Sequence, residues 1–572
     1  MHPVIALVLR QMRAPLALLV VAYAVSILGL VLIPGVDANG QPWQMGFFHA
    51  FYFVSYTATT IGFGEIPYPL TDAQRLWVVV CIYLTVIGWL YAIGKILTLV
   101  QDSQFRNFAN THSFKRQVEA MREPFYIICG YGDTGSMLVQ ALSYRGKRVV
   151  VIDESEKRIN HLHLTNLPVY VPAICADTTR VSKLKEAGIL HRYCLGVVAL
   201  TSHDQANLKI AITAKLLNPK LTVICRAENH DAEANMHSFG TDFIINPFDI
   251  FAQRLALALH STGAYILHEW LYGVPNEPLP EAIKVPHGLW VLCGYGRFGK
   301  AVYSNLQDEG MNTTIVEAKP EEADCIGMCV VGRGTEAATL QEAGIEEAVG
   351  IVAGTDDDTN NLSIIITAKQ LNPNLFTVAR QNARDNDDIF TAADIDLLMR
   401  RSHVIAHDIF ARLTTPLLII FLDLVLKQSH HWVNLLVSQL AAVVEGEVPD
   451  IWTFNINPRG TAAVYDAIKA GDLVTLGEIL VDARQRSHHH SALVLLVRNN
   501  RGEIQLAPQC DYPLQHGDEL LICSARGVEN KIRTVLSNHN ALFYIRTGID
   551  RPTGWIWEKL FPYQPATSQH EP

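Results

Sequence analysis

Two long uncharged stretches near the N-terminus set the strongest constraint on how this 572-residue chain can fold. Residues 14–34 contain 21 positions without a charged side chain, and residues 76–94 contain 19. At about 1.5 Å per helical residue, each stretch can cross the roughly 30 Å hydrocarbon core of a bilayer. The first is too long for a secretory leader, and a second span follows it. The sequence therefore predicts two transmembrane helices.

Basic residues flank these spans on one side of the predicted membrane. Arg10 and Arg13 precede the first span and Lys95 and Arg106 follow the second, whereas the segment between the spans carries a net charge of −2. Because cytoplasmic flanks carry an excess of Lys and Arg, this bias places both ends of the pair in the cytoplasm. We expect a multi-pass protein of the cell inner (plasma) membrane, in contact with lipid and with both termini cytoplasmic.

The segment between the two spans is not an ordinary loop. Residues 46–56 are apolar and aromatic, too short to cross a bilayer, and lead into a Thr- and Gly-rich run at 57–64 that is followed by Glu65. A short helix that enters the membrane and returns is tolerated only where protein or a water-filled cavity satisfies the backbone after it. Glycines alternating with Ile61 and Phe63 permit the dihedral angles that point successive carbonyls along one axis. Rings of such carbonyls replace the hydration shell of K+.

The region after the spans contains a strand–turn–helix pattern with a glycine-rich turn. The apolar run 125–129 leads to Gly130, Gly132 and Gly135, and a second apolar run ends at Asp153, 18 residues beyond Gly135. This is the βαβ fingerprint of dinucleotide binding. Its glycines allow the turn and a close approach of phosphate, its helix N-terminus faces the pyrophosphate, and its acid accepts from a ribose hydroxyl.

The same fingerprint occurs a second time. The apolar run 289–293 leads to Gly294, Gly296 and Gly299, and Glu317 lies 18 residues beyond Gly299. The string ITAKLLNP at 212–219 also returns as ITAKQLNP at 366–373. Internal repetition is stronger evidence than either motif alone, and strands alternating with helices predict doubly wound parallel sheets.

The acids at 153 and 317 favour a nucleotide with a free 2′-hydroxyl, such as NAD, over NADP. In the first copy Asp177 follows the third strand and can reach an adenine or ribose, whereas the second copy has Arg333 there. The two copies therefore need not bind the same ligand. We expect at least one of them to bind an adenine nucleotide; the alternative is a Rossmann scaffold that has lost its ligand.

The string Thr60, Ile61, Gly62, Phe63, Gly64 resembles the selectivity filter of potassium channels, with Ile in place of Val and Phe in place of Tyr. The resemblance implies K+ as the permeant ion and a homotetramer, since one chain with two spans supplies one filter strand. It also implies a gating hinge at Gly88 in the second span. Close helix packing is the alternative role for that glycine.

The tandem copies resemble the RCK family, the regulators of K+ conductance. Together with the spans, this resemblance implies a membrane α-helical pore domain with a re-entrant pore helix, then two Rossmann-like α/β domains and a small α/β C-terminal lobe. In this family such domains form a gating ring beneath the pore. The expected divisions are a pore domain (1–100), a helical linker (101–123), the first RCK domain (124–286), the second (287–439), the lobe (440–540) and a tail (541–572).

Composition and motifs narrow the remaining classes of function. A net charge of −10 argues against nucleic acid as a partner. The Asp runs at 356–358 and 385–388 are candidate Ca²⁺ ligands but lack EF-hand spacing, so no metal-binding residue is assigned. No nucleophile–base pair is recognisable, and we expect no enzyme activity. Two alternatives remain, a membrane-anchored NAD-dependent oxidoreductase and a nucleotide-binding regulatory subunit of another K+ transporter, and neither uses the filter string.

Overall fold

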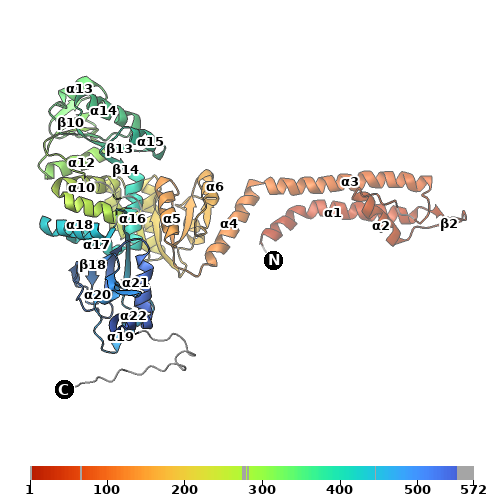
Figure 1. Ribbon diagram of the computed structural model, residues 1–572. Coiled ribbons are helices and arrows are strands. Elements are labelled where there is room, and N and C mark those ends of the chain that lie inside the picture. Colours follow the sequence, from red (N-terminus) through yellow and green to blue (C-terminus); the bar gives the residue numbers. More distant parts are fainter. Residues whose placement is uncertain (1–2, 65–66, 274–278, 280–282, 445, 550–572) are drawn as a thin grey trace, which may run out of the picture. The chain divides into compact units, whose positions relative to one another are not determined.

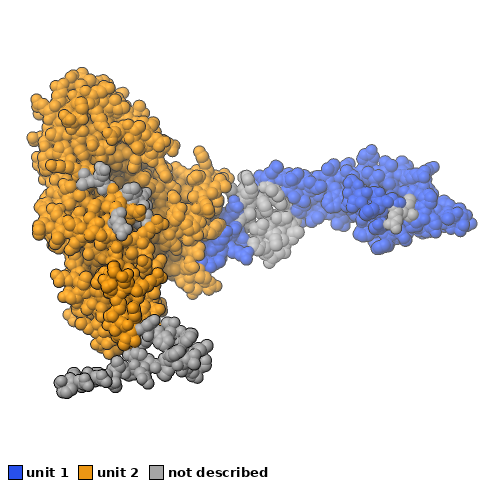
Figure 2. Space-filling model, viewed as in Figure 1, with its two compact units in different colours: residues 1–121 blue, residues 122–572 orange. Residues whose placement is uncertain are grey.

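The chain forms two compact units, residues 1–121 and residues 122–572 (Figure 2). The structure is a computed structural model that describes residues 3–64, 67–273, 279, 283–444 and 446–549 (Figure 1). Glu65 and the tail beyond residue 549 lie outside the described residues.

The first unit contains the two predicted spans and the short helix between them. Two of its helices, over Met12–Leu32 and Asp72–Thr98, are long and apolar enough to cross a membrane. These two helices coincide with the predicted spans. The elements of the unit are α1 (Pro3–Leu32), β1 (Gly35–Val36), β2 (Pro42–Trp43), α2 (Phe47–Ala58), α3 (Asp72–Gln101) and α4 (Ser103–Glu119).

Close packing of α1 against α3 fixes the outer frame of this unit. A Cβ added to Gly29 would lie 2.0 Å from Cε2 of Trp77, so only glycine admits the indole there. The indole Nε1 donates to the Ser26 carbonyl at 3.2 Å. The short helix α2 buries Ala50, Phe53 and other apolar residues against this frame. These contacts hold the C-terminal end of α2 beside the filter string.

The second unit contains two copies of one sheet. In the first, six parallel strands lie in the order β5-β4-β3-β6-β7-β8. The elements of this first repeat are β3 (Phe125–Cys129), α5 (Asp133–Tyr144), β4 (Arg148–Asp153), α6 (Glu156–Leu164), β5 (Ala173–Cys175), α7 (Val181–Glu186), β6 (Cys194–Ala199), α8 (Asp204–Leu217), β7 (Thr222–Arg226), α9 (His230–Ser238), β8 (Phe243–Ile245), α10 (Pro247–His260) and α11 (Thr262–Tyr272).

The second sheet has the corresponding order β11-β10-β9-β12-β13-β14, also all parallel. The predicted pair of Rossmann-like domains is therefore confirmed. The elements of this second repeat are β9 (Leu289–Cys293), α12 (Arg297–Asp308), β10 (Asn312–Glu317), β11 (Cys329–Val331), α13 (Ala337–Glu342), β12 (Gly350–Ala353), α14 (Asp358–Leu371), β13 (Phe376–Gln381), the 3-10 turn Arg384–Asn386, α15 (Asp387–Ala392), β14 (Leu397–Arg400), α16 (Arg401–Thr414) and α17 (Pro416–Val425).

Each repeat covers the other with a helix (Figure 1). Helix α10 of the first repeat packs Phe248 and Phe251 against Phe298 of α12. Helix α16 of the second repeat packs against α5, and its Ile405 belongs to the same buried cluster as Leu138 of α5. The helix that follows each glycine-rich turn is therefore buried by the opposite repeat.

The stretch 247–272 forms two helices, α10 and α11. It breaks at Ser261, whose Oγ accepts from the Ala264 N–H at 3.3 Å and caps α11. The corresponding stretch of the second repeat breaks before Pro416, the first residue of α17, because proline has no N–H to continue the preceding helix.

A small lobe follows the second repeat. Its antiparallel sheet has the order β15-β20-β18-β19, and a hairpin of β16 and β17 lies beside it. The predicted boundary at residue 440 falls inside α18. The elements are α18 (His430–Val444), β15 (Asp450–Asn455), α19 (Ala462–Lys469), α20 (Leu476–Leu480), β16 (Val481–Asp482), β17 (Gln485–His489), β18 (Ala492–Arg498), β19 (Ile504–Leu506), β20 (Glu519–Ser524), α21 (Val528–Ser537) and α22 (His539–Thr547).

Candidate functional site

The backbone of the filter string alternates in handedness. Thr60, Gly62 and Gly64 have φ values of 61°, 63° and 70°, whereas Ile61 and Phe63 between them have no positive φ. Thr60 is strained in this region, since a β-branched residue rarely adopts it. Alternation of this kind turns successive carbonyls toward one side of the chain. The alternation is compatible with the carbonyl row that the sequence predicts, and the role of these residues as a filter stays a prediction.

Helix α2 fixes the start of this row. The N–H groups of Ile61 and Gly62 both donate to the Tyr56 carbonyl, at 3.0 and 3.3 Å, at the C-terminal end of α2. The ring of Phe63 packs edge-on against the Tyr56 ring, with centroids 6.1 Å apart. Ile61 and Phe63 are nonetheless 60% and 66% exposed in the single chain. The side chains of the filter string are therefore largely uncovered in the single chain.

The predicted hinge Gly88 lies inside helix α3, which runs unbroken from Asp72 to Gln101. A Cβ added at Gly88 would lie 3.3 Å from Cδ2 of Leu19 on α1, whereas one added at Gly94 would meet nothing within 4 Å. Gly88 thus has a packing role in this conformation. Its role as a hinge stays a prediction.

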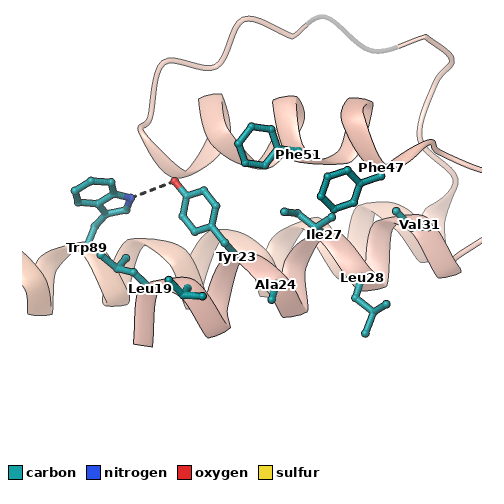
Figure 3. Close-up of a pocket in the computed structure, with 10 residues that line it drawn as sticks. Leu19, Tyr23, Ala24, Ile27, Leu28, Val31, Phe47, Phe51 and Trp89 are labelled. Carbon is teal, nitrogen blue, oxygen red and sulfur yellow. Dashed lines mark hydrogen bonds between the residues drawn. The ribbon is translucent and has the colours of Figure 1, made fainter. Parts of the chain in front are cut away.

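An apolar groove of about 610 Å³ lies between α1 and α2 in the first unit. Phe47 and Phe51 of α2 face Ile27 of α1 across it, and Trp89 of α3 donates to the Tyr23 hydroxyl at 3.5 Å (Figure 3). The groove offers apolar surface, which suits lipid chains or another apolar helix rather than a polar ligand.

The glycine-rich turns use their three glycines for different purposes. Gly130 and Gly294 have positive φ, 107° and 93°. A Cβ at Gly135 would lie 2.1 Å from the Gly130 carbonyl oxygen, so this glycine lets the helix approach the strand. A Cβ at Gly132, in contrast, would meet no atom closer than 4.0 Å. Packing therefore does not require a glycine at 132.

The glycines of the second repeat differ from one another in the same way. A Cβ at Gly299 would lie 2.0 Å from the Gly294 carbonyl oxygen, whereas one at Gly296 would meet nothing within 4 Å. Two copies thus keep a middle glycine that packing does not demand.

The acids at the ends of β4 and β10 accept hydrogen bonds from the backbone of the glycine-rich turns. Asp153 is buried, and its two carboxylate oxygens accept from the Tyr131 N–H at 2.6 Å and the Ser155 N–H at 2.8 Å. Glu317 accepts from the Tyr295 N–H at 2.7 Å and the Lys319 N–H at 3.1 Å. Each carboxylate oxygen has a second lone pair, so these acids can also accept from a ribose hydroxyl.

The structure brings most of the predicted nucleotide residues together in two pockets. The first, of about 220 Å³, is lined by Gly130, Gly132, Asp153 and Asp177 among others. Hydrogen bonds from the Thr179 hydroxyl and N–H lower the pKa of Asp177, and Arg180 nearby adds to this. Gly135 lies behind this pocket as a packing residue.

The second pocket, of about 540 Å³, is lined by Gly294, Gly296 and Glu317, with Gly299 behind it. Arg333 stands where the first repeat has Asp177. The lining of the second pocket is the more basic of the two, with Arg297, Lys300, Lys319, Arg333 and Arg380.

The acidic runs considered for Ca²⁺ are occupied by neighbours in the chain. Asp356 pairs with Arg380 at 2.6 Å, Asp357 caps α14, and Asp358 accepts from the Asn382 and Ala383 N–H groups. Among the described residues, ligand atoms within 4.8 Å of one another occur instead at His230, Glu233 and Asp249. Within the described part of the chain, the carboxylates of the runs at 356–358 and 385–388 are not grouped at metal-ligand spacing, although the Asn386 side-chain amide donates to Asp358 at 2.7 Å.

Sequence reasoning missed a group of charges between the two repeats. Glu228 is buried and pairs with Arg226, with Arg297 at 3.3 Å and with Arg401 at 3.0 Å. Burial alone raises the pKa of Glu228, but the three guanidinium groups outweigh this, and the pKa lies below its usual value. We call Arg226, Glu228, Arg297 and Arg401 the seam cluster. The only signal in the sequence was an arginine inside the second glycine-rich motif.

Fold and site together combine two helices that are long and apolar enough to cross a membrane with two pockets beside glycine-rich turns. Residues 16–102 match the ion channel family, and residues 126–247 and 290–400 match the TrkA-N domain family. The chain thus combines a segment that matches the ion channel family with two segments that match the TrkA-N domain family, and it is similar to potassium channel proteins of archaea and bacteria.

Among its relatives, Potassium channel protein 1 of Methanocaldococcus jannaschii is 28% identical over 37% of this chain and 61% of the relative. An uncharacterized protein of Methanothermus fervidus is 32% identical over 47% of this chain and 39% of the relative. The voltage-gated potassium channel Kch of Escherichia coli is 24% identical over 37% of this chain and 49% of the relative. The chain thus covers less than two thirds of these relatives.

Among solved structures, the GsuK channel has a TM-score of 0.50 and 15% identity over 93% of this chain and 99% of that chain. At this identity the likeness supports the fold.

Proposed function

We propose that this chain is the subunit of a potassium-selective channel gated by an adenine nucleotide such as NAD. The observation that carries the proposal is the alternating backbone at Thr60–Gly64, held at the end of a short apolar helix between two membrane spans. A row of carbonyls in this setting replaces the water around K+. The potassium channels among the relatives support the same ion.

The filter is incomplete in one chain, and we propose a homotetramer around a common axis. Exposed Ile61 and Phe63 and the apolar groove beside α2 supply surface for neighbouring chains and for lipid. Four chains would bring eight TrkA-N-type domains, enough for a gating ring without another subunit. We place the chain in the cell inner membrane with both termini in the cytoplasm, in line with the basic residues that flank the spans.

The nucleotide acts as an effector rather than as a substrate in this proposal. A ligand shifts the balance between closed and open rings only by its difference in affinity for the two. The free space at Gly132 and Gly296 supports nucleotide binding in both repeats. We do not extend the proposal to Ca²⁺, since the aspartates at 356–358 already bind groups of the chain.

Reconstitution into liposomes tests the proposal. We expect K+ flux that exceeds Na+ flux and changes on addition of NAD or ADP, and we expect Gly62→Asp to abolish it. Flux that is absent, or unaffected by Gly62→Asp, would refute the channel. Nucleotide binding without ion flux would favour a regulatory subunit. Oxidation of NADH on addition of a carbonyl substrate, followed as a loss of NADH absorbance, would favour an oxidoreductase.

A further inference from the structure

The connection between the second and third strands of the sheet differs between the two repeats. In the first repeat, residues 154–172 join β4 to β5 and include helix α6. In the second repeat, residues 318–328 join β10 to β11 and contain turns and bends but no helix, although the joined strands pair in the same register. The second connection is thus shorter, and its last part lies between two cysteines, Cys325 and Cys329.

The two thiols of this connection are in contact. The Sγ atoms of Cys325 and Cys329 lie 2.9 Å apart, and both cysteines are free thiols. The sulfurs of a disulfide are about 2.05 Å apart, so an approach of about 0.9 Å would join them. Gly327 has a φ of 90°, and this left-handed conformation turns the chain back between the two cysteines. The backbone therefore already holds the pair in a nearly closed loop.

The pair is accessible from solvent. Both cysteines are half-buried, and Ile326 and Met328 between them are 66% and 72% exposed. Cys129, at the end of β3, is in contrast fully buried. A small reagent can therefore reach Cys325 and Cys329 without unfolding the sheet.

We propose that Cys325 and Cys329 form a site of reversible oxidation, at which a low-molecular-weight disulfide such as oxidised glutathione converts the two thiols to an internal disulfide. One protein thiolate attacks a sulfur of the small disulfide, forms a mixed disulfide and releases one small thiolate. The other protein thiolate attacks the protein sulfur of the mixed disulfide, which closes the internal disulfide and releases the second small thiolate. The two protons of the protein thiols pass to the released thiolates. The protein thus loses two electrons and two protons, and the small disulfide becomes two thiols.

Cys329 is the thiol that attacks first. Burial raises the pKa of Cys325, and its hydrogen bond and charge interaction with Cys329 raise it further. Cys325 therefore stays protonated in the reduced pair, and a protonated thiol is a poor nucleophile. Once Cys329 is bound in the mixed disulfide it carries no charge. This part of the rise in the pKa of Cys325 then disappears, and Cys325 can resolve the intermediate.

The site adjoins the pocket of the second repeat. Both cysteines pack against the buried cluster that contains Tyr295, the second residue of the second glycine-rich turn. Glu322 and Ala323, from the turn just before Cys325, line the pocket. Closing the disulfide moves the end of this turn and with it the pocket wall. Oxidation therefore changes the affinity of the pocket for its ligand, a consequence that rests on the proposed function in taking the pocket as a nucleotide site.

Thiol labelling of the full-length chain in detergent tests the oxidation site. The chain is treated with oxidised glutathione or with dithiothreitol, labelled with a maleimide and digested, and the peptide that contains Cys325 and Cys329 is weighed. We expect two labels on this peptide after dithiothreitol. After oxidised glutathione we expect none, with the mass of the unlabelled peptide less two hydrogens, and dithiothreitol should then restore both labels. Retention of both labels, or glutathione adducts without the internal disulfide, would overturn the site.

Single variants test the order of attack. Cys325→Ser should leave Cys329 as a mixed disulfide with glutathione, whereas Cys329→Ser should leave Cys325 free to take the label. Cys510→Ser is the matched control, because Cys510 is an exposed free thiol, and this variant should oxidise at the pair as the wild type does. The reverse pattern in the two serine variants would overturn Cys329 as the attacking thiol.

Calorimetry with ADP tests the effect on the second pocket. The first pocket is closed by Gly132→Asp, where a side chain has space and a carboxylate repels phosphate. In this background we expect the dissociation constant for ADP to differ at least about fivefold between the reduced and oxidised chains. The double variant Cys325→Ser, Cys329→Ser should show no such difference. Equal affinities in the two states would overturn the effect on the pocket. Absence of ADP binding in both states of a chain that forms the disulfide would overturn nucleotide binding there and leave the oxidation site standing.

Discussion

The Arg401 guanidinium lies 3.0 Å from the Glu228 carboxylate, although 173 positions separate the two residues in the sequence. The pair joins the second repeat to the first, and Arg297 reaches the same carboxylate from the second glycine-rich motif. A contact of the nucleotide with either arginine therefore also changes the pairing of Glu228. The seam cluster is thus placed to connect nucleotide binding with the contact between repeats.

Removal of the Glu228 charge should weaken the fold. In Glu228→Gln, Arg226 would remain buried without a carboxylate, and breaking a buried ion pair in this way costs about 3 kcal/mol. We expect a clear fall in the thermal unfolding midpoint of the full chain in detergent. Glu233→Gln is the control, because that carboxylate pairs only with the exposed His230 in the described structure and should change stability by less than about 0.5 kcal/mol. Similar midpoints for the two variants would contradict this role.

A buried histidine should make stability depend on pH. Burial, with smaller contributions from His403 and Arg254 nearby and against the opposing effect of Glu269, lowers the pKa of His407 to about 4. In the unfolded chain the pKa returns to about 6.5, so between pH 4 and 6.5 the unfolded state binds the extra proton. The stability that neutral His407 supplies is therefore complete above pH 6.5 and is lost as the pH falls toward 4, by about 3 kcal/mol in total.

His407→Gln isolates this contribution, since glutamine does not titrate. The unfolding midpoint of the wild type should rise relative to that of the variant from pH 4 to 6.5, and the difference should be constant above. His230→Gln, at a side chain that is 78% exposed, provides the control. A difference between wild type and His407→Gln that does not vary with pH would show that His407 titrates normally.

The glycines of the first turn should respond differently to the same substitution. Gly135→Ala would place a Cβ 2.1 Å from the Gly130 oxygen and push α5 off β3, at a cost of about 3 kcal/mol. Gly132→Ala meets no such atom and should leave the unfolding midpoint within error while weakening nucleotide binding. Thermal unfolding and ADP calorimetry on both variants check the pair. Equal loss of stability in the two would mean that the middle glycine is structural.

The parts of the fold that depend on local sequence could be predicted. The strands 125–129 and 289–293 have the predicted bounds because apolar runs beside glycine-rich turns leave little choice of register. The breaks between α10 and α11 at Ser261 and between α16 and α17 at Pro416 also have local signals, a capping serine and a proline.

The seam cluster had a single weak signal, the arginine inside the second glycine-rich motif. Its partners come from β7, from α12 and from α16, and only the crossing of α10 and α16 between the repeats brings them together. Sequence spacing likewise pointed to Asp153 as a ligand residue but not to its bonds with the backbone of the glycine-rich turn. Contacts between distant segments need the fold itself.

The filter glycine provides the most direct test of the pore. Gly62 has a φ of 63°, and alanine in this left-handed region costs about 1 kcal/mol per chain, so Gly62→Ala should relax the backbone and turn a carbonyl away from the row. We expect K+ flux in liposomes to fall about tenfold or more and the preference for K+ over Na+ to shrink, because coordination depends on all the carbonyls. Gly40→Ala is the matched control, since Gly40 has a φ of 76° and open space around it but lies in the loop before α2. It carries the same local strain and should leave flux and selectivity unchanged. If both variants lose flux alike, the strain of the substitution rather than the filter geometry accounts for the loss.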